Sequence, residues 1–124
     1  MATILLVEDN ENQQVLFAEE LRLDGHDVAV VGSGAEAIEA VRERPPDLVV
    51  LDVAMPEMDG IEALGRILAE NNRIPIILHT AYATYKDSFM AWSADAYVIK
   101  SSDLSELKAE VSRVLANREK PKAP

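Results

Sequence analysis

The sequence contains no cysteine, no apolar run long enough to cross a bilayer, and no glycine-rich loop behind its first predicted strand. Without cysteine there is no disulfide, no thiolate nucleophile, and no zinc or iron–sulfur site of the cysteine type. The apolar runs fall far short of the roughly 20 residues of a membrane helix, and the start at Met1 has no basic leader segment. These absences predict a soluble cytoplasmic protein, and the missing glycine-rich loop disfavours a nucleotide or flavin site.

Basic residues are also scarce, since 12 Lys and Arg stand against 22 Asp and Glu, for a net charge of −10. A field of this sign repels nucleic-acid phosphates, so direct DNA binding is not expected. It suits a divalent cation or a basic partner surface, although an acidic balance can equally serve solubility alone. The length of 124 residues fits a single domain, which we predict over residues 1–118, followed by a polar, flexible tail at 119–124.

Short apolar runs alternate with amphipathic stretches along the chain. Those at 4–7, 48–51 and 76–79 are continuous and rich in Val, Ile and Leu, which is typical of parallel strands buried on both faces. The predicted strands cover residues 4–7, 28–31, 48–51, 76–79 and 96–99, with 28–31 nearer an edge. The predicted helices cover residues 10–24, 33–43, 59–71 and 84–92, and a last helix begins at Asp103.

This alternation predicts an α/β fold, a doubly wound parallel sheet with helices on both faces and right-handed crossovers. In such sheets ligands bind outside the carboxyl ends of the strands, where the strand order reverses. Polar residues stand at four of these ends, and they are the acid pair Glu8-Asp9, then Asp52, Thr80 and Lys100. Acids, a hydroxyl and an amine at one sheet edge predict a site for a divalent metal and a phosphoryl group.

Each of these residues also has a plainer interpretation. Glu8-Asp9 could be an acidic pair that interacts favourably with the dipole of the following helix at its N-terminus. Thr80 alone is an ordinary strand-end residue. Together with Asp52, however, the acid pair would crowd three carboxylates, which destabilise one another unless a cation intervenes. Mg²⁺ is the natural guest, because it binds through one or two carboxylates, waters and a phosphate oxygen. Asp52 could also act as a nucleophile that carries an aspartyl phosphate, with Lys100 neutralising the transferring group.

The chain resembles the receiver domain of two-component response regulators, the CheY-like family, over residues 4–115. The resemblance rests on five features in register: Glu8-Asp9, Asp52 with Met55-Pro56 and Asp59-Gly60 behind it, Thr80-Ala81, Lys100, and Tyr97 three residues before that lysine. It implies a flavodoxin-like sheet of five parallel strands in the order 2-1-3-4-5 with five helices.

The resemblance also implies roles in a phosphorelay. A histidine kinase or histidine phosphotransfer protein would phosphorylate Asp52. Asp9 and Asp52 would bind Mg²⁺ directly, with Glu8 acting through water and the backbone carbonyl of Ala54 as a further ligand. Lys100 would pair with the phosphoryl group.

The same resemblance implies a switch. Thr80 would move toward the phosphoryl group and Tyr97 would turn inward, which changes the surface of residues 84–92, strand 96–99 and the last helix. That surface would dock a protein target or pair with a second copy of the chain. No effector domain follows the last helix in this sequence, so the chain either docks onto a target or is part of a longer protein.

Two positions depart from the family pattern. Ser101 follows Lys100, where the family usually has proline and often a cis bond, and a cis bond before serine would cost roughly 3–4 kcal/mol. We therefore expect a trans bond with a reshaped loop or a strained cis bond. Ser93 stands where glycine is common, and it would carry strain in a left-handed conformation.

Two rival functions remain. A phosphatase of the haloacid dehalogenase type would need a second acid two residues after the nucleophile, but that residue is Ala54. An interaction module that works without phosphorylation would be expected to lack one of the acids or the lysine, and this chain has them all. We therefore predict a regulatory phosphoacceptor rather than an enzyme, with at most slow self-dephosphorylation.

Overall fold

The computed structural model describes residues 2–53, 60–81 and 93–117. Within these ranges five strands alternate with helices. The strands are β1 (Thr3–Val7), β2 (Asp27–Val31), β3 (Leu48–Leu51), β4 (Ile76–Thr80) and β5 (Ala96–Ile99). The helices are α1 (Glu11–Leu23), α2 (Gly34–Glu43), α3 (Gly60–Glu70) and α4 (Ser105–Asn117).

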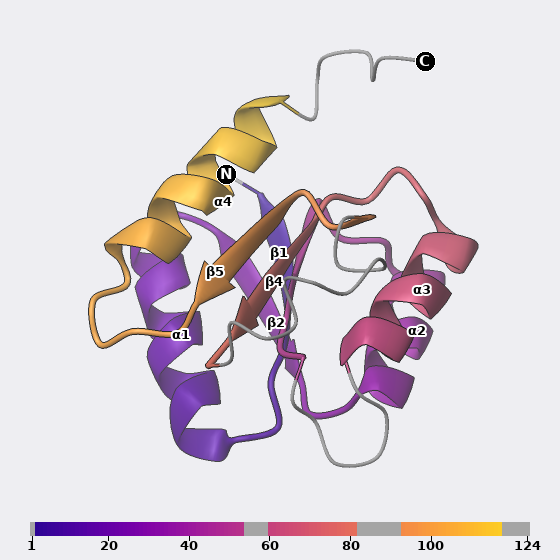
Figure 1. The fold of residues 1–124 in the computed structure, drawn as a ribbon, viewed down its shortest axis with the longest axis horizontal. Coiled ribbons are helices and arrows are strands. Elements are labelled where there is room, and N and C mark those ends of the chain that lie inside the picture. The colour runs from indigo at the N-terminus through magenta and orange to yellow at the C-terminus, as the bar shows by residue number, and fades with distance from the viewer. Residues whose placement is uncertain (1, 54–59, 82–92, 118–124) are drawn as a thin grey trace.

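The strands form one parallel sheet in the order β2-β1-β3-β4-β5. Figure 1 shows α1 and α4 together on one face of this sheet and α2 and α3 on the other. The chain therefore winds in both directions from β1, and the order reverses between β1 and β3. This is the predicted doubly wound fold, and the reversal places a crevice at the carboxyl ends of those two strands.

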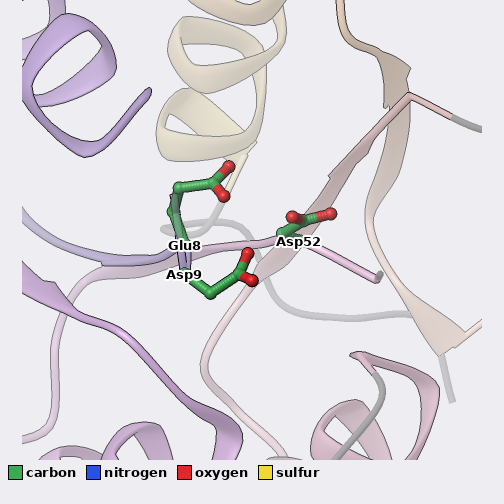
Figure 2. A group of neighbouring side chains, drawn as sticks. All are labelled: Glu8, Asp9 and Asp52. Atoms are coloured by element: carbon green, nitrogen blue, oxygen red, sulfur yellow. The ribbon is translucent and has the colours of Figure 1, made fainter. Parts of the chain in front are cut away.

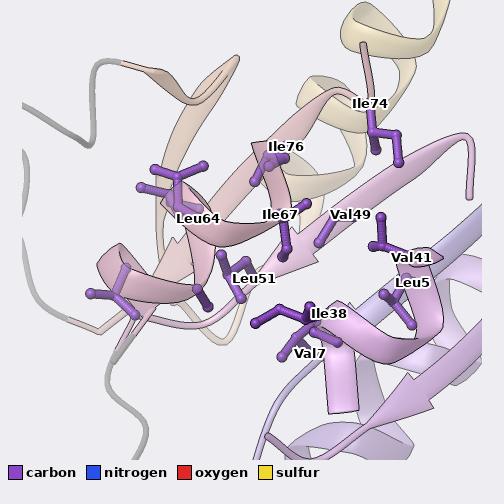
Figure 3. Packing of buried hydrophobic residues seen from close by; sticks show 14 residues of the cluster. Leu5, Val7, Ile38, Val41, Val49, Leu51, Leu64, Ile67, Ile74 and Ile76 are labelled. Atoms are coloured by element: carbon purple, nitrogen blue, oxygen red, sulfur yellow. The ribbon is translucent and has the colours of Figure 1, made fainter. Parts of the chain in front are cut away.

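Each face of the sheet has its own apolar core. The face under α2 and α3 is packed by alternate residues of β1 and β3, such as Leu5 and Leu51, against Ile38, Leu64 and Ile67 (Figure 3). The opposite face is packed by the intervening strand residues against α1 and α4, where Phe17, Leu21, Leu107 and Val111 are buried. Burial on both faces explains why β1, β3 and β4 have continuous apolar sequences.

Local sequence sets most helix ends. The side chain of Asn10 caps α1 by accepting a hydrogen bond from the backbone N–H of Gln13, and Ser33 caps α2 in the same way through Glu36. Gly25 ends α1 with a φ of 95°, a conformation that favours glycine. The last helix begins at Ser105, two residues after Asp103, whose carboxylate accepts from the Ser105 N–H at 2.9 Å.

The structure confirms the five predicted strands to within a residue, and β2 lies at the sheet edge as expected. The helix predicted at 84–92 and the tail at 119–124 lie outside the described residues.

Among the described residues there is no cis peptide bond, and no residue other than glycine has a positive φ. The Lys100–Ser101 bond is therefore trans and Ser93 carries no left-handed strain. Across the described ranges, no helix has the length and apolar character needed to cross a membrane.

Candidate functional site

The sheet register brings the site together at the ends of β1 and β3. Val7 pairs with Leu51 at the last position of both strands, and the backbone N–H of Asp52 donates to the Val7 carbonyl at 3.0 Å. Glu8 and Asp52 are the next residues along these neighbouring strands. Residues far apart in the sequence are thus held at one edge by backbone hydrogen bonds, as the alternation of strands and helices predicted.

Three carboxylates converge at this edge (Figure 2). Glu8, Asp9 and Asp52 each offer an oxygen atom within 4.8 Å of the others. Glu8 and Asp52 are buried, whereas Asp9 is exposed, so the cluster has one side open to solvent. Hard oxygen donors at this spacing, with access from water, fit a small divalent cation such as Mg²⁺.

Lys100 supplies positive charge to the same cluster. Its side chain is only 13% exposed, and its Nζ atom lies 2.6 Å from Glu8 Oε1 and 3.1 Å from Asp52 Oδ2. The backbone places this lysine, because its N–H donates to the Thr80 carbonyl at 2.7 Å, just beyond the end of β5. The ammonium therefore compensates two buried carboxylates that would otherwise repel each other.

Opposing influences act on the pKa of the Glu8 carboxyl. Burial raises the pKa of its carboxyl and the nearby Asp52 charge raises it further, while hydrogen bonds from Lys100 and from the Asn10 backbone oppose the rise. The net direction is upward. Any loss of the lysine would therefore favour protonation of Glu8 or the entry of another cation.

The remaining predicted residues lie around this centre. Thr80 ends β4 and is fully buried, so it stands at the correct sheet edge. Tyr97 is partly buried and packs on the core cluster under α2 and α3, and β4 separates its strand from β3 and Asp52. Ala54, the predicted backbone ligand, lies outside the described residues.

The sequence interpretation missed two contributions from α1. Gln13 Oε1 accepts a hydrogen bond from Lys100 Nζ at 2.5 Å, and Gln14 Nε2 donates to the Glu8 carbonyl at 2.6 Å. Phe17 lies one turn further along, with its ring centroid 5.8 Å from Lys100 Nζ. Glutamines in the first turn of a helix carry no sequence signal for a site, and only the packing of α1 against the sheet reveals them.

His79 lies next to Thr80 and is buried against the ring of Phe17, with a centroid separation of 4.8 Å. Burial, and to a smaller extent the positive charge of Lys100, lower the pKa of His79 to about 4. The folded protein therefore keeps this imidazole neutral, while the unfolded chain protonates it below about pH 6.5.

This difference predicts acid destabilisation through His79. Stability is fully present above about pH 6.5 and is lost as the pH falls toward 4, by about 3 kcal/mol in total, because only the unfolded state binds the extra proton. Urea unfolding at pH 7 and near pH 4.5 checks this. We expect His79→Leu to lose about 2 kcal/mol less than the parent over that interval. Equal losses in both proteins would show that His79 does not titrate as described.

Comparison with known proteins identifies the family. The profile described as "Response regulator receiver domain" matches residues 4–112. The chain belongs to the response regulator receiver domain family. It is 40% identical over 116 residues to the transcriptional regulatory protein ZraR of Escherichia coli O157:H7, covering 92% of this chain and 26% of ZraR. The chain thus spans about a quarter of that relative's length.

Two solved structures of a response regulator resemble this chain over more than nine-tenths of its length. The response regulator TrrA from Thermotoga maritima, in complex with Mg²⁺-BeF, has a TM-score of 0.89 and 38% identity, covering 92% of this chain and 99% of TrrA. TrrA in its complex with the histidine kinase ThkA has a TM-score of 0.87 at the same identity, covering 93% of this chain and 99% of the matched chain. The family and the CheY-like fold expected from the sequence are thus confirmed for this receiver domain.

Proposed function

We propose that Asp52 is the phosphoacceptor of this receiver domain and takes a phosphoryl group from a phosphohistidine of a partner protein. The observation that carries the proposal is the contact of Lys100 with two buried acids, Glu8 and Asp52, beside the exposed Asp9. The complex of the similar TrrA with a histidine kinase supports a kinase, or a histidine phosphotransfer protein, as the partner.

In the proposed step, an Asp52 carboxylate oxygen attacks phosphorus and forms an O–P bond. The P–N bond of the donor breaks, its electron pair stays on the imidazole nitrogen, and that nitrogen then takes up a proton from solvent. The Lys100 ammonium lies where it can donate to a phosphoryl oxygen as negative charge builds up. Positioning and charge compensation are most of what this reaction asks of a protein.

Mg²⁺ fits the donor set, and its positive charge would offset that of the phosphoryl oxygens. Asp9 and Asp52 are the proposed direct ligands. Glu8 would act through water, and the backbone carbonyl of Ala54 would be a further ligand. The mutual approach of the three acids to within 4.8 Å, and the Mg²⁺-BeF complex of TrrA, support this assignment.

The proposed output is a change of surface. Thr80 would move toward the phosphoryl group and Tyr97 would turn inward, which would alter the face that β5 and α4 form. The helix predicted at 84–92, which lies outside the described residues, is proposed to belong to the same surface. That face would dock a protein target, a second copy of the chain, or an effector domain if the chain is part of a longer protein. We assign the switch to residues 1–118, with 119–124 as a tail outside it.

Chemical trapping tests the phosphoacceptor directly. The protein is incubated with Mg²⁺ and acetyl phosphate, and borohydride then reduces any acyl phosphate to an alcohol, which converts an aspartyl phosphate into homoserine. We expect homoserine at position 52, found by peptide mass spectrometry, and none when Mg²⁺ is omitted. Homoserine at another acid would move the site. No product from a folded protein that binds Mg²⁺ would favour an interaction module that works without phosphorylation.

A further inference from the structure

The Lys100 ammonium group uses three acceptors, of which only two belong to the acidic cluster. Glu8 Oε1 lies 2.6 Å from Nζ, Gln13 Oε1 lies 2.5 Å away, and Asp52 Oδ2 lies 3.1 Å away. An ammonium has three N–H donors, so the set is complete. The third acceptor is a neutral carboxamide that comes from a helix rather than from a strand end.

Helix α1 holds Gln13 in place. The backbone N–H of Gln13 donates to the capping side chain of Asn10 at 3.0 Å, which fixes the first turn. Phe17 lies four residues later on the same helix face, is buried, and places its ring near Lys100 Nζ. One stripe of α1 therefore supplies both a polar and an aromatic wall for the lysine.

The distances indicate what this arrangement does. The two shortest contacts of Nζ are to Glu8 and Gln13, and its contact with Asp52 is the longest of the three. The ammonium thus lies closer to Gln13 of α1 and to Glu8 than to Asp52, which it still contacts. A carboxamide has no charge at any working pH, so it can hold the lysine without adding to the negative charge of the acidic cluster.

We propose that Gln13 is a positioning residue for phosphoryl transfer, because its side-chain oxygen holds the Lys100 ammonium at the distance from Asp52 that the reaction requires. This inference rests on the proposed function of Asp52. Through Gln13, helix α1 would help to position the lysine for phosphoryl transfer. Small displacements of a positioned charge reduce reaction rates strongly, so the effect of losing the Gln13 acceptor should be measurable.

The matched variants are Gln13→Met, which keeps the length of the side chain but removes the acceptor, and Gln13→Glu, which keeps an oxygen at the same reach. We expect Gln13→Met to slow phosphorylation by acetyl phosphate with Mg²⁺ by about tenfold, and Gln13→Glu to stay closer to the parent. Asn12→Met, an exposed change in the same turn, is the control and should leave the rate unchanged.

A double-mutant cycle separates positioning from a general structural effect. If Gln13 acts through the lysine, Gln13→Met should have no further effect on the rate in a Lys100→Met background. If it merely weakens α1, the loss should be similar in both backgrounds. A similar loss would overturn the proposal.

A second measurement needs no phosphorylation. Competitive acetylation of the metal-free protein with trace acetic anhydride, mapped by mass spectrometry, reports how firmly each lysine amine is held. We expect Lys100 to become several-fold more reactive in Gln13→Met, relative to Lys108 as internal reference, and to be unchanged in Asn12→Met. Unchanged labelling would overturn the Gln13 proposal even if Asp52 is phosphorylated. Changed labelling with no homoserine at position 52 would overturn the phosphoacceptor and its positioning, and would leave only the hold of Gln13 on Lys100.

Discussion

The Asp52→Asn protein is expected to accept no phosphoryl group from acetyl phosphate and Mg²⁺, with a rate lowered by a factor on the order of a thousand or more. The reason is chemical, since a carboxamide oxygen is not a nucleophile toward phosphorus at neutral pH, whereas a carboxylate oxygen is. The measurement is the initial rate of phosphoryl incorporation, followed by phosphoprotein gel or intact mass.

The fold should survive this change. Asparagine has almost the same shape as aspartate, and the Lys100 ammonium keeps its contacts with Glu8 and Gln13. We expect the free energy of unfolding to stay within about 1 kcal/mol of the parent. Asp27→Asn is a suitable control, because Asp27 is exposed at the amino end of β2, far from the site edge of the sheet. Incorporation at the parental rate in Asp52→Asn would mean that another acid carries the phosphoryl group.

The second large effect concerns stability without metal. Lys100→Met should lower the free energy of unfolding by about 3–5 kcal/mol at pH 7, because it leaves two buried carboxylates without their counter-ion. The side chains of Glu8 and Asp52 are only 2% and 6% exposed, so water cannot replace the ammonium well. Urea unfolding of the metal-free protein, in the presence of a chelator, measures the loss.

Two further observations would tie that loss to charge rather than to packing. Added Mg²⁺ should restore part of the stability of Lys100→Met, and more than it adds to the parent, since the ion binds only the folded site. Acid should also reduce the deficit. Burial already raises the pKa of Glu8, and without the lysine its folded-state pKa rises further, so the folded variant binds a proton that the unfolded chain releases.

Lys108→Met is the matched control. Lys108 also pairs with two acids, Glu20 at 2.7 Å and Asp24 at 3.7 Å, but its side chain is 30% exposed. Surface pairs of this kind contribute little to stability, because water solvates both charges. Equal losses in the two methionine variants, or a Lys100→Met deficit that does not respond to Mg²⁺, would contradict the description of the site as a compensated buried charge cluster.

Local sequence predicted much of the architecture because each strand and helix has its own physical signature. The continuous apolar runs of β1, β3 and β4 reflect burial on both faces, and the Asn10 and Ser33 caps follow from side-chain chemistry within one turn. For the Lys100–Ser101 bond, the sequence predicted either a trans bond with a reshaped loop or a strained cis bond, and the structure decides between them. The bond to Lys100 is trans, and the Ser101 hydroxyl accepts from the Asp103 N–H at 3.2 Å.

Taken alone, the sequence determined the elements and the set of polar residues at the strand ends, because hydrophobic periodicity and strand-end chemistry are local properties. The tertiary structure decided which of these residues meet. The pairing of β1 with β3 joins Glu8 to Asp52, and the packing of α1 on the sheet brings Gln13 to Lys100 across 87 positions of sequence. Such contacts depend on register and side-chain reach between distant segments, and no local pattern encodes either.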